Sequence, residues 1–362
     1  MDRNELQETA AKYLFNKKRL VCMWATGTGK SNVVLRFLKE HPMDTLILVP
    51  EQNNIENWRE EFRKFGVDDS RVFVICYASL HKFTRTNWGL LVLDEVPHMD
   101  TQKRIAMLRS VCGEYILALG AVVDEDERNS LELVYGKFPF WHISLKRAID
   151  MGILPKPRVY VIHMELDDTD KKYWHKGRLY TAKGKYDYLN RTVDSAVNAF
   201  ANSATKGNKF WMQRAGNERK RFLGELKEEA LKRICDGLEK MGKRFLCFCS
   251  SVKQAERIGG EKAFTSKSPK SFDHLNKFNN HEINSLYVVG KLIEGQNLKD
   301  IDCGVIGQLG GTQRITVQEI GRILRSDNPM IYTLVFDDTK DNSFLYTLTS
   351  SIPEEYISHL NF

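Results

Sequence analysis

The string ATGTGKS at 25–31 restricts the fold of this chain more than any other feature. It follows an apolar, strand-like run, RLVCMWA, and precedes an amphipathic, helix-like run, SNVVLRFL. The glycines allow a sharp turn, so that amide N–H groups at the start of the helix point at phosphate oxygens. The lysine then reaches the β- and γ-phosphates, and the serine hydroxyl binds Mg²⁺. The alternative is a glycine-rich turn with a solvated lysine. The residues assigned to the nucleotide are Thr26, Gly27, Thr28, Gly29, Lys30 and Ser31.

A second motif, LLVLDEVP, places Asp94 and Glu95 directly after four apolar residues. Ligands of open α/β sheets bind at the carboxyl ends of such strands. Two adjacent carboxylates can divide the work there, with Asp94 holding Mg²⁺ and Glu95 polarising the attacking water. By itself, an Asp-Glu pair at the end of a strand more often belongs to a solvated loop. Only its combination with the upstream phosphate loop favours a catalytic role.

Apolar runs alternate with amphipathic stretches over the first hundred residues and again from about residue 223 to the end. This pattern predicts an α/β protein with two parallel-sheet domains in tandem. We expect domain 1 at 1–150, a hinge, an edge strand and a basic, aromatic-rich insertion at 151–222, and domain 2 at 223–362. The GILPKP stretch at 152–157 supplies the turn chemistry of a hinge, and PRVYVIHMEL supplies the strand.

The composition bounds the function without selecting it. The 362 residues include 54 Lys and Arg against 47 Asp and Glu, a net charge of +7, which allows an anionic partner such as a polynucleotide. The seven cysteines are scattered, and most lie in apolar runs, which favours reduced thiols and a cytoplasmic protein. No segment has the length and apolarity of a membrane span or the pattern of a signal peptide, so no membrane role is expected.

Together these motifs resemble those of superfamily 2 DExH-type helicases and translocases, and the similarity runs over most of the chain. The resemblance implies that the two parallel-sheet domains are RecA-like. RNELQ resembles the adenine-reading element of that family and nominates Gln7 and, less directly, Arg3. LVPEQNNIENWREEFRKFG resembles motif Ia of restriction-enzyme motors, with Pro50 as a nucleic-acid contact and a downstream helix carrying Trp58 and Glu61.

Later motifs follow the same family order. YASL resembles motif Ib, which implies that Tyr77 and Ser79 touch nucleic-acid phosphates, and FCSSVKQAERI resembles motif IV, with Ser250 as a further contact. GKLIEGQNLKDIDCGVI resembles motif V and nominates Gly295 and Asn297 for the nucleotide. QEIGRILR resembles motif VI. The longer stretch GGTQRITVQEIGRILR resembles the excision-repair translocase of the general transcription factor TFIIH and its phage or bacterial relatives.

Motif VI also has a physical logic. Gln318, Arg322 and Arg325 recur at helical spacing, so their side chains share one face and can cross an interdomain cleft to a γ-phosphate. The alternative is an ordinary basic helix face, which the presence of motifs I and V disfavours.

Two motifs depart from the family pattern. Motif II reads Asp94-Glu95-Val96-Pro97, with His98 one position beyond the usual histidine, and Gly120-Ala121-Val122 replaces a hydroxyl-bearing motif III. In the family these motifs contact each other and help couple hydrolysis to movement. We therefore hypothesise that ATP hydrolysis survives while its coupling to strand separation is altered.

The predicted insertion mixes basic and aromatic residues in 171–188 and 206–221. Aromatic rings stack on bases and basic groups bind phosphates, so Trp174, Lys176, Lys209 and Trp211 are candidate nucleic-acid contacts. A helical connector whose aromatics pack on domain 2 is an equally good interpretation.

We expect an ATP-dependent DNA helicase or translocase that uses ATP and Mg²⁺, is stimulated by nucleic acid and is a monomer. A targeting or loading protein is an expected partner. An RNA helicase is the alternative within the class, and an ATP-switched nucleic-acid clamp with little unwinding is the alternative outside it.

Overall fold

The computed structural model describes residues 1–82, 86–96, 101–264, 270–289, 298, 300–308, 320–324 and 326–362. Its helices are α1 (Arg3–Lys17), α2 (Ser31–Glu40), α3 (Gln52–Phe65), α4 (Thr101–Arg109), α5 (Glu125–Tyr135), α6 (Leu145–Asp150), α7 (Ala182–Asn202), α8 (Lys206–Leu226), α9 (Glu228–Lys240), α10 (Val252–Gly259), α11 (Lys270–Asn279) and α13 (Lys340–Thr349), with 3-10 turns η1 (Tyr77–Lys82), η2 (Gly260–Lys262) and η4 (Glu354–Tyr356). Its strands are β1 (Arg19–Trp24), β2 (Thr45–Val49), β3 (Val72–Cys76), β4 (Asn87–Asp94), β5 (Cys112–Gly120), β6 (Phe140–Ile143), β7 (Arg158–Met164), β8 (Tyr173–His175), β9 (Arg178–Tyr180), β10 (Phe245–Cys249), β11 (Ala263–Phe264), β12 (Ser285–Val289), β13 (Cys303–Ile306), β14 (Met330–Phe336) and β15 (Ile357–Asn361).

The first 143 residues build a parallel six-stranded sheet in the order β3-β2-β4-β5-β1-β6. Alternate residues of its strands enter two different cores. Cys22, Val92 and Leu119 pack with α1, α2 and α3 on one face, whereas Val21 and Leu93 pack with α4 and α5 on the other. Burial on both faces explains the continuous apolar runs of these strands.

The second sheet has seven parallel strands in the order β11-β12-β10-β13-β14-β7-β15. The prediction that 158–164 forms an edge strand is wrong, because β7 lies between β14 and β15. The C-terminal strand β15 takes the edge. Its sequence, ISHLN, is short and largely exposed, so it lacks the apolar run of a buried strand.

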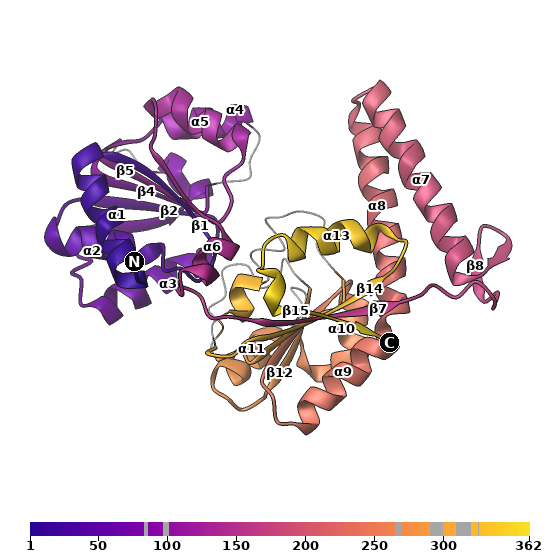
Figure 1. Cartoon of the computed structure of the whole chain (residues 1–362). Coiled ribbons are helices and arrows are strands. Elements are labelled where there is room, and N and C mark those ends of the chain that lie inside the picture. The colour runs from indigo at the N-terminus through magenta and orange to yellow at the C-terminus, as the bar shows by residue number, and fades with distance from the viewer. Residues whose placement is uncertain are drawn as a thin grey trace.

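Between β7 and β10 the chain forms a small antiparallel hairpin, β8 and β9, and two 21-residue helices, α7 and α8. We call α7 and α8 the arm, because Figure 1 shows them as an antiparallel pair projecting away from the second sheet. Val193, Ala196 and Ala215 hold the two helices together. Tyr186 and Phe222 pack with Phe336 at the base of the arm. Among the described residues, none of the helices is both long and apolar enough to span a bilayer.

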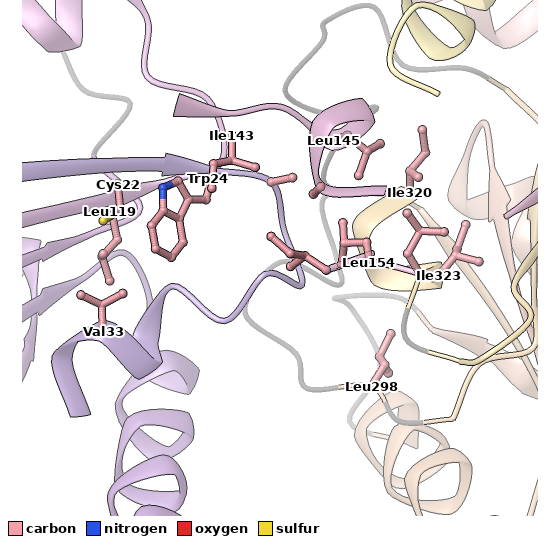
Figure 2. Packing of buried hydrophobic residues seen from close by; sticks show 14 of the residues in the cluster. Cys22, Trp24, Val33, Leu119, Ile143, Leu145, Leu154, Leu298, Ile320 and Ile323 are labelled. Atoms are coloured by element: carbon pink, nitrogen blue, oxygen red, sulfur yellow. The ribbon is translucent and has the colours of Figure 1, made fainter. Parts of the chain in front are cut away.

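One buried cluster continues from the first sheet into the second. Figure 2 shows Trp24 and Ile143 at the end of the first sheet, Leu145 and Leu154 beyond them, and Ile320 and Ile323 on the other side. The predicted hinge at 152–157 therefore crosses between the sheets with Leu154 buried in this cluster. The carboxyl ends of β1 and β4 open toward the same junction.

Candidate active site

The phosphate loop connects β1 to α2, and its two glycines have the left-handed backbone that the turn requires. The φ angle is +90° at Gly27 and +82° at Gly29. Ser31 is the first residue of α2, so the predicted hydroxyl ligand lies at the helix N-terminus. Lys30 Nζ donates to the carbonyl oxygen of Trp24 at 3.1 Å, which keeps the ammonium group beside the loop.

Gln7 supports the loop from behind. It is fully buried, and its Nε2 donates to the carbonyl oxygen of Thr28 at 3.1 Å. A Cβ on Gly29 would lie 2.3 Å from the same Nε2, so only glycine leaves room for this contact. Arg3 lines the nucleotide cavity instead, with Nη2 donating to the carbonyl oxygen of Ile153 at 2.6 Å. Of the two predicted adenine-reading residues, Arg3 is the one at the cavity.

Asp94 is the last residue of β4, and two buried aromatic residues hold it. Trp58 Nε1 donates to Asp94 Oδ2 at 2.9 Å, and the Tyr77 hydroxyl donates to the Asp94 carbonyl oxygen at 2.9 Å. Burial and the neighbouring Glu95 carboxylate raise the pKa of Asp94 to about 6, although the Trp58 hydrogen bond and Lys30 oppose this rise. A bound cation would favour the ionised form of Asp94. Glu95 itself has φ +46°, a strained backbone for a residue with a side chain.

One face of α3 forms a wall of the same cavity. Asn54, Asn57, Trp58 and Glu61 line it at helical spacing, and Asn54 Oδ1 is buried without a hydrogen-bond partner among the described residues. The motif resemblance singled out Trp58 and Glu61 on this helix, but not Asn54 and Asn57 or the position of this face at the cavity. The sequence signal for this face is the helical spacing of these four residues, at positions i, i+3, i+4 and i+7.

The cavity, of about 750 Å³, lies between the two sheets. The first sheet contributes the phosphate loop, Asp94 and Glu95, and the second contributes Arg322, Leu324, Ser326 and Asp327. Arg322 is 9 % exposed, so its guanidinium is close to buried. Gly321 touches the phosphate loop directly, because a Cβ there would lie 2.5 Å from Thr26 Cβ and 3.0 Å from its carbonyl oxygen. The phosphate loop and part of motif VI thus share one space.

Several features of this space fit ATP and Mg²⁺. The hydroxyls of Thr26 and Ser326 are buried and, among the described residues, have no hydrogen-bond partner, so each can serve a ligand. Ser31 and Asp94 supply the oxygen donors that Mg²⁺ prefers. No group of three or more His, Cys, Asp or Glu side chains in the described part of the chain offers a separate metal site.

The remaining predicted residues differ in their placement. Gly295, Asn297, Gln318 and Arg325, like Pro97 and His98, lie outside the described residues. Tyr77, predicted as a nucleic-acid contact, is buried, and its hydroxyl donates to the Asp94 carbonyl oxygen.

The other predicted nucleic-acid contacts lie on or near the surface. Pro50 is exposed and Ser79 is partly exposed, whereas the Ser250 hydroxyl donates to Gln254 Oε1 at 2.8 Å. Trp174 is 68 % exposed on the hairpin, and Lys176, also exposed, donates to the Tyr188 hydroxyl. Lys209 and Trp211 are exposed on α8.

Comparison with known proteins agrees with this geometry. Residues 1–124, which contain the phosphate loop and both carboxylates, match the family "Type III restriction enzyme, res subunit". The DNA 3'-5' translocase XPB2 of Sulfurisphaera tokodaii is 24% identical over 368 aligned positions, covering 89% of this chain and 78% of the relative. The first third of the chain is thus similar to a restriction-enzyme motor family, and most of its length is similar to a DNA translocase.

A solved helicase structure shows the same fold. The helicase domain of Hef from Pyrococcus furiosus superposes with a TM-score of 0.59 at 13% sequence identity, over 94% of this chain and 97% of that domain. Two parallel sheets in tandem are therefore the architecture that this chain shares with that domain.

Proposed function

We propose that this chain couples ATP hydrolysis to movement along DNA or to the remodelling of complexes on it. It is an ATP-hydrolysing enzyme of the helicase class. The observation that carries the proposal is the meeting of Gly321 and Arg322 of the second sheet with the phosphate loop of the first. A nucleotide between them contacts both domains, so a change in its phosphates changes how the domains fit together.

The chain's own residues divide the work as follows. The loop amides and Lys30 bind the phosphates, and Ser31 and Asp94 hold Mg²⁺, which neutralises charge on the phosphoryl oxygens when it is bound. Glu95 orients and deprotonates the attacking water. Arg322 approaches from the second domain and stabilises charge on the γ-phosphate. Its near burial excludes water and strengthens that interaction.

The arm and its hairpin are the proposed nucleic-acid surface. Residues 171–226 hold thirteen Lys and Arg against four Asp and Glu, a net charge of +9, whereas the whole chain carries +7. Phe210 is 66 % exposed and Trp211 41 %, so rings for base stacking lie among these charges. DNA is favoured as the polynucleotide because XPB2 of Sulfurisphaera tokodaii is a DNA translocase.

The clamp alternative has one specific observation in its favour. Between motif II and motif III the described contact is a backbone one, Val96 N–H to the Leu119 carbonyl oxygen at 3.3 Å. Ala121 and Val122 carry no hydroxyl to extend it. A chain that hydrolyses ATP on DNA but displaces no strand would fit this alternative.

The test is steady-state ATPase with Mg²⁺ at fixed salt, comparing no polynucleotide with single- and double-stranded DNA and RNA. Lys30→Ala is the blank, and it should lower kcat/KM by at least about a hundredfold because the lysine binds the transferred phosphoryl group. We expect strong stimulation by one form of DNA. Turnover that is indifferent to every polynucleotide would contradict the motor, and stronger stimulation by RNA would reassign its track.

A further inference from the structure

An ion pair sealed from solvent lies under the base of the arm. Lys227 Nζ and Asp341 Oδ2 are 2.6 Å apart, and both side chains are 0% exposed. Gln308 bridges the pair, because its Oε1 accepts from Lys227 at 3.2 Å and its Nε2 donates to Asp341 Oδ1 at 2.8 Å. The Phe336 backbone N–H also donates to Asp341 Oδ2 at 3.2 Å. Both carboxylate oxygens are thus occupied.

Such a pair is an expensive way to stabilise a fold. Burial lowers the pKa of Lys227, which the nearby Asp341 carboxylate opposes. Apolar residues of similar volume often replace a buried ion pair with no loss of stability. Beyond packing, the pair provides geometric specificity, because the ammonium, the amide and the carboxylate can hydrogen-bond to one another in only one arrangement.

The pair joins both helices of the arm to α13. Lys227 is the residue between the end of α8 and the start of α9. Asp341 lies in the first turn of α13, next to Lys340, whose backbone N–H donates to the Tyr186 hydroxyl of α7 at 2.8 Å. A displacement of the arm therefore pulls on the start of α13 at two points.

The Gln308 amide lies next to a strand that packs against the helical residues at the nucleotide cavity. Gln308 closely follows β13, and β13 packs against the helical residues 320–323, because a Cβ on Gly304 would lie 2.0 Å from Ile323 Cδ1. Those residues bring Gly321 against Thr26 and Arg322 into the cavity. The cluster of Lys227, Gln308 and Asp341 thus contacts the arm on one side and adjoins β13, which packs beside Arg322, on the other.

We propose that Lys227, Gln308 and Asp341 are positioning residues that link the arm to Arg322, so that a polynucleotide held by the arm sets the arginine at the nucleotide. This inference rests on the proposed function and names how that site is regulated. The link is reciprocal, as any coupling between two binding sites is, so nucleotide at the cavity also changes the arm.

The test uses the full chain with both charges replaced, Lys227→Met together with Asp341→Leu, which leaves no buried charge unpaired. The matched control replaces a neighbouring, partly exposed ion pair, with Glu228→Leu together with Arg257→Met. This pair joins α9 to α10. Amide hydrogen exchange of α7 and α8 is measured with and without a non-hydrolysable ATP analogue. ATPase, DNA affinity and unfolding are measured on the same samples.

We expect the analogue to alter exchange in the arm of the parent and the control but not of the buried-pair variant. That variant should keep its stability and basal ATPase within about twofold and lose at least about fivefold in stimulation by DNA. An arm that responds to the analogue equally in all three proteins, or in none, would overturn the proposal. Absent DNA stimulation in the parent would instead contradict the proposed function alone, because the exchange measurement does not depend on DNA.

Discussion

Ionisation of Asp94 destabilises the folded chain when no cation is bound at the nucleotide site. Its pKa of about 6 lies above the ordinary value of 3.8, so the folded chain holds the proton more tightly than the unfolded chain. Stability contributed by the protonated form is present below about pH 4 and is lost as pH rises through about 6. Above that range, without Mg²⁺, the folded chain keeps a carboxylate that its surroundings disfavour.

Asp94→Asn should therefore stabilise the metal-free chain at pH 8, where the cost is fully present. The asparagine still accepts from Trp58, and we expect a gain of about 3 kcal/mol in the free energy of unfolding, which should shrink toward zero by pH 4. Urea unfolding in EDTA at both pH values measures it, and ATPase should be lost in the same variant. A gain that is equal at both pH values would exclude the ionisation as its cause.

The Trp58 indole N–H fixes one oxygen of the proposed Mg²⁺ ligand. Trp58→Phe keeps an aromatic ring but removes the donor and part of the ring volume, and we expect about a tenfold higher Mg²⁺ concentration for half-maximal binding of a fluorescent ATP analogue. Trp24→Phe is the matched control, because Trp24 is also buried and its Nε1 has no partner in the described part of the chain. Equal shifts in the two variants would mean that general packing, not the hydrogen bond, is responsible.

These residues also show where sequence reasoning stops. The phosphate loop and the Asp94-Glu95 pair could be predicted because each is a short string whose flanks declare a strand and a helix. Trp58 could be assigned to a motif but not to Asp94, since that bond joins residues 36 positions apart. For the same reason, the sequence gives no sign that the Tyr77 hydroxyl donates to Asp94. Its partner is a carbonyl that only the folded sheet brings near.

At the scale of elements, charge separates the arm from the two sheets. Two parallel-sheet domains follow from apolar periodicity, but the interior place of β7 depends on β15, whose sequence carries no strand signal. The arm could be predicted in composition only. Its basic and aromatic residues fit a hairpin or a helical connector equally well, and the structure contains both, β8–β9 and then α7–α8.

Basic residues of α8 should govern the salt dependence of DNA binding. Replacing Lys206, Lys209 and Arg214 by Ala removes three exposed cations. If each contacts a phosphate, the slope of log affinity against log salt concentration falls in magnitude by about 2–3 for duplex DNA. Fluorescence anisotropy over a salt series measures it. The control variant replaces Lys232, Arg233 and Lys240 on α9 by Ala, with the same loss of charge, and should leave the slope unchanged. Equal slopes in the two variants would exclude the arm as the contact.

At the scale of the whole molecule, catalysis depends on how closely the second domain approaches the phosphate loop. Gly321 sets that distance, because the nearest atoms to an added Cβ are Thr26 Cβ at 2.5 Å and the Thr26 carbonyl oxygen at 3.0 Å. These Thr26 atoms belong to the backbone or are fixed directly to it, so they cannot move aside as the end of a flexible side chain could. Gly321→Ala must therefore separate the domains, and with them Arg322 from the nucleotide.

A displacement of about 1 Å at a catalytic group can cost about a hundredfold in rate, so we expect kcat/KM for ATP to fall by that order in Gly321→Ala. Gly237→Ala is the control, since it lies within α9 and nothing is within 4 Å of its added Cβ. Gly237→Ala should unfold no more easily than the parent, because alanine favours a helix over glycine by roughly 0.5–1 kcal/mol. Gly321→Ala gains the same preference but loses packing between the domains, so its free energy of unfolding should not exceed that of the control. Full ATPase in Gly321→Ala would show that hydrolysis needs no such approach, and Arg322 would then have no catalytic role.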